Sequence, residues 1–121
     1  DMPPVIIIKN NQALLHLHSG DFSFIDGKAI SRLYDLLAEK SITANLIQTG
    51  AVTLMVCTDD KEDKINQLAM AASAIFDVKV EKNLSLLTIR HYTQEAIVEM
   101  TDGKQIVLKQ QSPQTVQFLL R

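Results

Sequence analysis

Two histidines and one cysteine are the side chains in this sequence with the most versatile chemistry. His16 and His18 are two positions apart in an alternating stretch, so on a strand they point to the same face, about 7 Å apart at the backbone, a spacing that a metal ion could bridge. No Cys, Asp or Glu accompanies them in that stretch, so we interpret them as residues of a covered sheet face. Cys57 follows Met55 and Val56 and reads as a buried, inert thiol. We therefore predict no catalytic residue and no metal site.

The best candidate for a binding site is the loop that precedes a strongly amphipathic stretch. Asp26 can cap a helix that begins there, and Gly27 permits a sharp turn. Backbone N–H groups at a helix N-terminus bind a carboxylate well. A polar strand end with Asn45, Gln48 and Thr49 can receive an amine or a side chain. These features suit a free amino acid, although the residues alone favour it no more than a plain helix cap beside a polar strand.

The elements that would position this loop follow in the order β-α-β-β-α-β. Apolar residues at Ile30, Leu33, Tyr34 and Leu37 predict a helix that ends near Lys40, because this spacing lines one helical face. Alternating or β-branched stretches predict the strands, and a second apolar stripe predicts a second helix. The strands are expected at 13–19, 42–49, 52–58 and around 78–80, and the second helix at 61–75. The fold class is therefore α+β: a ferredoxin-like βαββαβ domain with an antiparallel sheet and helices on one face.

A second, incomplete unit surrounds the first in the sequence. Thr93 can cap a short helix at 94–100, and Asp102-Gly103 signals a turn. Strands at 84–91, 105–110 and 115–120 give only β-α-β-β, so a further strand has to come from 5–9, before a polar break at 10–12. We expect two units: the first at 13–82, and the second, incomplete one at 5–12 and 83–121.

Composition excludes several classes of function. The 121 residues include 12 basic and 14 acidic side chains, interspersed, which argues against a nucleic-acid binder. No strand shows the basic-aromatic signature of an RNA-binding sheet, and no glycine-rich phosphate loop is present. No apolar run approaches the ~18 residues of a membrane span, and the N-terminus lacks a signal-peptide pattern. Because a single cysteine fits a reducing compartment, we expect a cytoplasmic protein without nucleic-acid or membrane partners.

The string LLAEKSITANLIQTGAVTLMVCTDD resembles the regulatory half of aspartate kinases, where this loop-helix-strand pattern belongs to an ACT domain. The string NLSLLTIRHY is similar to the join to that family's second ACT unit, and the resemblance extends from Pro3 to Arg121. It implies two ACT units, the first inserted into the second. It also implies the C-terminal regulatory region of an enzyme that phosphorylates L-aspartate with ATP on the way to lysine, threonine and methionine. Asp1 in place of Met is further reason to expect a fragment.

The resemblance also sets expectations for ligands and partners. It implies a non-catalytic fragment with no cofactor of its own, since ATP and Mg²⁺ belong to the catalytic domain. It implies a homodimer through the ACT units, with a free amino acid as effector in the loop and strand end between two of them. Together with the residues themselves, it gives the expected effector-binding set: Ser23, Asp26, Gly27, Lys28, Ala29, Ile30, Asn45, Gln48 and Thr49.

Three positions differ from the lysine-sensitive members of that family. Asn45 stands where they have an aspartate, and Gly50-Ala51 replaces a serine-glutamate pair. Without these carboxylates a cationic side chain lacks a charge-assisted partner, so we expect lysine to bind weakly. Threonine, another neutral amino acid, or no effector remain as expectations. The alternatives to the kinase fragment are a free-standing ACT-type amino-acid-binding module and a dimerisation domain that binds no ligand.

Overall fold

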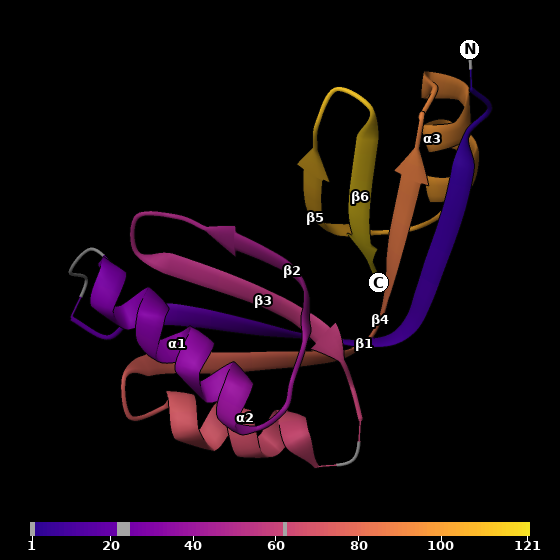
Figure 1. The fold of residues 1–121 in the computed structure, drawn as a ribbon. Helices are drawn as coiled ribbons and strands as arrows, with labels where there is room; N and C mark the ends of the chain where they lie inside the picture. Colours follow the sequence, from indigo (N-terminus) through magenta and orange to yellow (C-terminus); the bar gives the residue numbers. More distant parts are fainter. Residues whose placement is uncertain (1, 22–24, 62) are drawn as a thin grey trace. The chain divides into compact units, whose positions relative to one another are not determined.

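The computed structural model describes residues 2–21, 25–61 and 63–121. Strands and helices are interspersed along the chain, in the α+β class that the sequence predicts (Figure 1). The chain divides into two compact units: the 13–82 unit, Ala13–Lys82, and the 83–121 unit, which joins the residues up to Gln12 to Asn83–Arg121. The elements are β1 Val5–Ser19, α1 Gly27–Glu39, β2 Ala44–Thr49, β3 Thr53–Asp59, α2 Lys64–Ala72, β4 Phe76–Arg90, α3 Gln94–Thr101, β5 Ile106–Gln111 and β6 Thr115–Leu120.

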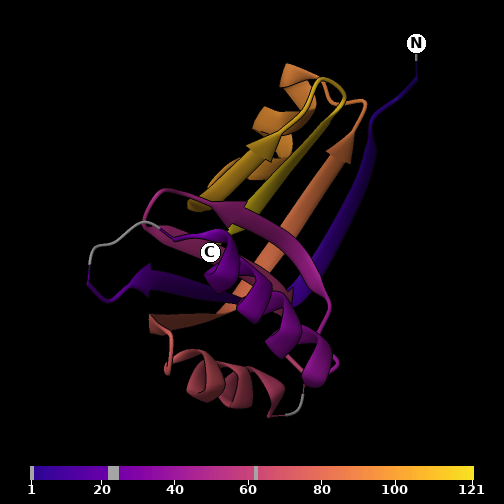
Figure 2. The same ribbon diagram turned by 60° about the vertical axis from the view of Figure 1, so that its left-hand side comes forward.

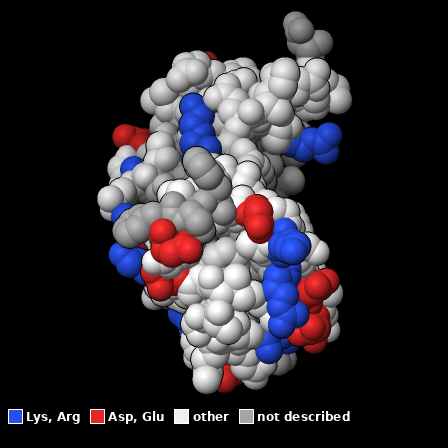
Figure 3. Space-filling model, turned by 90° about the vertical axis from the view of Figure 1, so that its left-hand side faces the viewer, with Lys and Arg blue, Asp and Glu red and all other residues white. Residues whose placement is uncertain are grey.

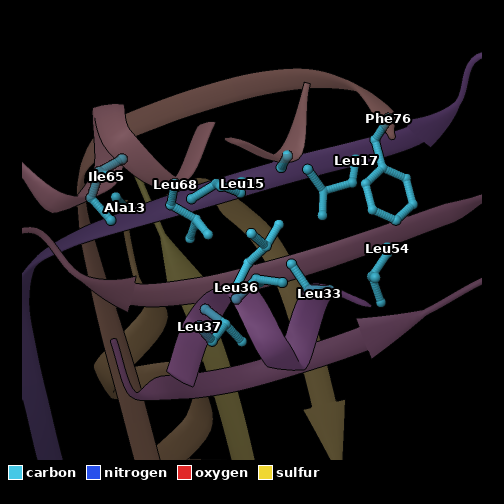
Figure 4. Packing of buried hydrophobic residues seen from close by; sticks show 12 residues of the cluster. Ala13, Leu15, Leu17, Leu33, Leu36, Leu37, Leu54, Ile65, Leu68 and Phe76 are labelled. Carbon is cyan, nitrogen blue, oxygen red and sulfur yellow. The ribbon is translucent and has the colours of Figure 1, made fainter. Parts of the chain in front are cut away.

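The 13–82 unit has the strand order β2-β3-β1-β4, to which β1 contributes 13–19 and β4 contributes 76–82. β2 and β3 pair antiparallel, with Ile47 opposite Val56. Alternate residues of β1, Ala13, Leu15 and Leu17, point to the face that both helices cover, where Leu33 and Leu68 also lie (Figure 4). This is the ferredoxin-like arrangement predicted from the order of the elements.

Helix α1 begins and ends where local chemistry requires. Asp26 caps it, as predicted, and beyond Lys40 the residue Ser41 adopts a φ of 53° while Ile42 N–H donates to Leu37 O at 2.9 Å. The predicted apolar face was partly wrong, because Tyr34 is 52% exposed and Leu36 is buried in its place. Around the helix axis, Leu36 lies about 60° from Leu33 on the side opposite to Tyr34, so the buried stripe is rotated toward Leu36 and away from Tyr34.

The 83–121 unit has the strand order β1-β4-β6-β5, with β1 outermost. β4 and β6 pair antiparallel, with Leu87 opposite Phe118. Helix α3 lies on one face of this sheet (Figure 2), capped by Thr93 as predicted. The core beneath it contains Leu87, Ile89, Val116, Phe118 and Leu120, against which Tyr92, Ile97 and Met100 pack.

The predicted break at 10–12 is absent, and the strands around 78–80 and at 84–91, expected to follow each other almost without a break, form one strand. The polar stretch 10–12 lies inside β1, and β4 runs without interruption from Phe76 to Arg90. Each strand instead contains one asparagine in the left-handed region, Asn11 with φ 55° and Asn83 with φ 61°. Asparagine tolerates this conformation better than most residues. A polar residue such as Asn11 or Asn83 can thus mark a local irregularity inside a long strand instead of the end of that strand.

Helix α2 is shorter than the predicted 61–75, and the two aspartates just before that predicted start, Asp59 and Asp60, do not cap it. Asp59 is the last residue of β3 and accepts a hydrogen bond from Asn45 Nδ2 at 2.8 Å. Asp60 pairs with Lys82 Nζ at 3.8 Å. The helix therefore begins at Lys64, after Asp63.

The surface carries mixed charge. On the face in Figure 3, acidic and basic side chains lie among many uncharged ones, which agrees with a net charge of −2. In the described part of the chain, none of the helices has the length and apolar character needed to cross a membrane.

Candidate functional site

The loop predicted as a binding site leads into the N-terminus of α1. Asp26 Oδ1 accepts from Ala29 N–H at 3.0 Å, and Asp26 O accepts from Ile30 N–H at 3.2 Å. The first bond satisfies one of the amides that a helix leaves unpaired in its first turn, and the second is the first regular backbone bond of the helix. The remaining first-turn amides and the helix dipole favour an anionic group at this end.

The turn between β2 and β3 is hydrogen-bonded to the same loop and to the end of β1. Ile25 N–H donates to Ala51 O at 2.9 Å, and Ser19 N–H donates to Val52 O at 3.0 Å. Gly50 N–H closes the turn onto Thr53 O at 2.8 Å. A Cβ atom on Gly50 would stand 2.8 Å from Thr53 Oγ1, so a side chain there would force the Thr53 side chain to move. The end of β1, the start of α1 and this turn therefore form one connected surface.

A cavity of about 370 Å³ opens beside this surface, within the 13–82 unit. Ser19, Gly20 and Asp21 line it from the end of β1, and Ile25, Asp26 and Ala29 from the start of α1. Ile75 and Phe76 complete the lining. Ser19 Oγ donates to Asp21 Oδ1 at 2.9 Å, which holds that carboxylate at the mouth. The lining thus combines two carboxylates, a helix N-terminus and an apolar wall.

The structure brings some of the predicted site residues together. Asp26 and Ala29 line the cavity, Gly27 and Lys28 open α1, and Ile30 follows in its first turn. Thr49 ends β2 beside the turn that contacts the loop, and Gln48 precedes it, opposite Met55. Asn45 lies near the other end of β2, where it donates to Asp59. Ser23 falls outside the described residues.

Six lining residues were missed by the sequence analysis: Ser19, Gly20, Asp21, Ile25, Ile75 and Phe76. The topology contains the signal that could have found them. In the order β2-β3-β1-β4, the first and last strands of the unit are neighbours, so the end of one meets the start of the other. A Cβ atom on Gly20 would stand 3.7 Å from Asp77 Oδ2, which shows how closely 19–21 approaches 76–77.

The histidine pair lies elsewhere on β1. The His16 and His18 rings stack with centroids 4.2 Å apart, and His16 Nε2 is buried without a hydrogen-bond partner. Burial, and then the charges of His18 and Lys79, lower the pKa of His16 below its usual 6.5. Among the described residues, no three His, Cys, Asp or Glu side chains gather as metal ligands would. Cys57 is a buried free thiol, as predicted.

The fold and the cavity together define an α+β domain of the ferredoxin-like, ACT type, with a small pocket at the N-terminus of its first helix. No family model and no curated protein sequence matches the chain. Solved structures do match it. A C-terminal regulatory domain assigned to aspartate kinase from Porphyromonas gingivalis aligns over 100% of this chain and 88% of its own, with a TM-score of 0.83 and 18% identity.

Two complete enzymes show the same likeness. Escherichia coli aspartokinase III in complex with lysine and aspartate aligns over 94% of this chain, with a TM-score of 0.73 and 22% identity. Clostridium acetobutylicum aspartate kinase aligns over 96%, with a TM-score of 0.78 and 11% identity. This chain spans 28% and 30% of those two chains. It therefore has the fold of the regulatory part of aspartate kinases, as the sequence resemblance implied.

Proposed function

We propose that this chain is the C-terminal regulatory region of a cytoplasmic aspartate kinase, and that the cavity of the 13–82 unit binds a free amino acid as allosteric effector. The parent enzyme would phosphorylate L-aspartate with ATP and Mg²⁺ in the biosynthesis of lysine, threonine and methionine. One observation carries the proposal: a chain with the fold of such regulatory domains has a pocket of about 370 Å³ with groups for both ends of an amino acid.

The pocket offers a separate partner to each part of the ligand. The first-turn amides of α1, at Gly27 and Lys28, would take the carboxylate. The carboxylates of Asp21 and Asp26 would take the ammonium group by charge-assisted hydrogen bonds. A side chain directed away from these groups would meet the apolar wall that Ile75 and Phe76 contribute.

This arrangement favours a neutral effector over lysine. An apolar wall stabilises a short aliphatic or hydroxylated side chain, whereas a cationic one has to stay in water or compete for the carboxylates that hold the ammonium group. Asn45, where the lysine-sensitive relatives have an aspartate, is engaged with Asp59 near the far end of β2. Ala51 itself lies beside this surface, since Ala51 O accepts a hydrogen bond from Ile25 N–H at 2.9 Å.

Titration calorimetry of the chain against single amino acids tests the proposal. We expect one neutral amino acid to bind at micromolar to millimolar concentration, and lysine about tenfold or more weakly, because a missing charge-assisted partner costs about 1.5–3 kcal/mol. Ala51→Glu should strengthen lysine binding. Failure of every amino acid to bind would favour a dimerisation domain without a ligand.

A matched pair of variants separates binding from folding. Asparagine caps a helix as well as aspartate does, so Asp26→Asn removes the charge and keeps the cap. We expect about tenfold weaker effector binding in this variant. Asp35→Asn, on the exposed side of α1, makes the same chemical change away from the cavity and should leave affinity unchanged. Equal affinities in the two variants would contradict the proposed contact.

The second part of the proposal is a homodimer. Val5, Ile6, Ile7 and Ile8 are between 43% and 51% exposed on β1, the outermost strand of the 83–121 unit. Four consecutive exposed apolar residues on an outermost strand favour pairing with another chain. The sequence analysis expected a homodimer through the ACT units, with the first units meeting at their sheet edges or at the Phe24–Ile30 loop. Among the described residues, the exposed apolar run of β1, in the 83–121 unit, is the surface that best supports pairing.

A further inference from the structure

The tripeptide Asp-Gly-Lys occurs twice in this chain, once in each unit, at residues 26–28 and 102–104. An aspartate followed by glycine closes readily into a succinimide ring, because glycine has no Cβ atom to hinder attack by its backbone nitrogen. No other Asp or Asn in the sequence precedes a glycine. The two tripeptides have the same local chemistry, so the structure around each one decides how fast it reacts.

At Asp26 both the side chain and the main chain are held by α1. Asp26 Oδ1 accepts from Ala29 N–H at 3.0 Å, and the main-chain oxygen of Asp26 accepts from Ile30 N–H at 3.2 Å. Ring closure requires the side-chain carbon Cγ to move onto Gly27 N and the peptide between the two residues to rotate. These movements break both hydrogen bonds, so the ring can form only after the first turn of α1 has opened.

Asp102 lies in a turn, after the last residue of α3. Its φ of −58° and ψ of 131°, followed by a φ of 71° at Gly103, are the angles of a type II turn. Lys104 N–H closes this turn onto Thr101 O at 3.0 Å. A type I turn has the same closing bond, but its first central residue has a ψ of about −30°. The central peptide can therefore rotate between the two forms, which glycine permits, without loss of the bond that closes the turn.

We propose that Asp102 is a site of spontaneous isomerisation to isoaspartate, and that its cap protects Asp26 from the same reaction. Gly103 N attacks Cγ of the protonated Asp102 carboxyl group and forms a C–N bond, while the carboxyl hydroxyl leaves with the amide proton as one molecule of water. Water then adds to either carbonyl carbon of the ring. Cleavage at Cγ restores aspartate, whereas cleavage at the main-chain carbonyl carbon gives isoaspartate.

The product changes the link between α3 and β5. Isoaspartate adds one methylene group to the main chain, and the original main-chain carboxyl group becomes the side group. The bond from Lys104 N–H to Thr101 O then closes a larger ring of atoms. We therefore expect the amide signals of Thr101 and Lys104 to move in the isomerised chain, and those of the 13–82 unit to stay in place.

Peptide mapping of the aged chain tests the proposal. Folded protein is kept at neutral pH, with a parallel sample in concentrated urea, and isoaspartate at each pair is measured by electron-transfer fragmentation. In the folded chain we expect it to accumulate about tenfold or more faster at Asp102 than at Asp26, because a cap and a main-chain bond must first break at Asp26. In urea the two rates should be similar.

Equal rates in the folded chain, or faster reaction at Asp26, would overturn the proposal. A difference that persists in urea would also overturn it, since the neighbouring residues and not the folded structure would then set the rates. Asp102→Glu keeps the charge but requires a larger ring, so it should abolish the reaction in this turn and leave the rate at Asp26 unchanged. Isoaspartate that still formed in the peptide containing this turn would show that another residue is the source.

Discussion

The two units use β1 and β4 in exchanged roles. In the 13–82 unit β1 is an inner strand and β4 an outer one, whereas in the 83–121 unit β4 is inner and β1 is outermost. Two helices cover one sheet face in the first unit, and α3 covers part of it in the second. The strand order is equivalent, so the difference in burial between the units comes from their helices.

The arrangement of the helices also determines where the cavity of each unit lies and which residues line it. In the 13–82 unit the sheet face beneath the helices is closed, and the cavity lies at the end of the sheet, among Asp21, Asp26 and the N-terminus of α1. In the 83–121 unit a cavity lies on the sheet face itself, beside Lys104 and Arg121. The same strand order thus has a cavity at the end of the sheet in one unit and on the sheet face in the other.

The largest effect is expected in the core that both helices of the 13–82 unit share. Leu68 on α2 is fully buried and Met70, two residues on, is 78% exposed. Leu68→Ala should lower the free energy of unfolding by about 3 kcal/mol, and Met70→Ala by less than about 0.5 kcal/mol. Urea unfolding of both variants measures this. Similar losses would mean that α2 does not close this unit in the way described.

The outermost strand of the 83–121 unit gives the next prediction. Ile7→Glu places a charge in the exposed apolar run of β1 and should weaken self-association about tenfold or more. Val98→Glu, on the exposed side of α3, is the matched control and should have no effect. Sedimentation at micromolar concentration should show about twice the 13.5 kDa chain mass for the unaltered protein and for the control. A monomer in all three samples would contradict the proposed dimer.

Helix caps allow a direct comparison of the two units. Asp26 caps α1 and Thr93 caps α3 through equivalent bonds, of 3.0 Å to Ala29 N–H and 3.1 Å to Ala96 N–H. Asp26→Ala and Thr93→Ala should each cost about 1 kcal/mol of stability, while Asp26→Asn should cost almost nothing. Thermal unfolding of the three variants provides the measurement. An equal loss in Asp26→Asn would show that charge, not capping geometry, stabilises α1.

The smallest effect concerns pH and the histidine pair of the 13–82 unit. The pKa of His16 is lowered by burial and by the nearby His18 and Lys79, so below pH 6.5 the unfolded chain takes up this proton more readily than the folded one. Stability is therefore complete above pH 6.5 and falls as the pH drops toward the folded-state pKa, by less than about 1.4 kcal/mol per pH unit. His16→Gln should make the free energy of unfolding depend less on pH between pH 6.5 and 5. If the variant shows the same dependence as the unaltered protein, groups other than His16 cause it.

Much of the fold follows from local patterns in the sequence. The caps at Asp26 and Thr93 were predicted because short polar side chains precede apolar periodicity there, and both form the expected bonds. The continuity of β1 could not be predicted, and for β4 the sequence indicated two strands almost without a break between them. Polar residues such as Asn11 and Asn83 usually end a strand, and here the sheet holds them in place through long-range pairing.

Only some of the residues that line the candidate site could be predicted from the sequence. Asp26 and Ala29 were found because they belong to the helix start, which is a local signal. Asp21 and Phe76 join them only when the first and last strands of the unit pair, and no local pattern reports that. Asn45 was placed in the site by analogy of position, but in the structure it bonds Asp59, near the opposite end of β2 from Thr49.

Mapping where an amino-acid effector binds tests the central claim most directly. The 15N-labelled chain would be titrated with whichever amino acid calorimetry finds to bind best. The account predicts the largest amide shifts at Gly20, Asp21, Ala29 and Phe76, and none at Leu87 or Leu120. Shifts centred on the 83–121 cavity, or on Asn45 and Asp59, would contradict it.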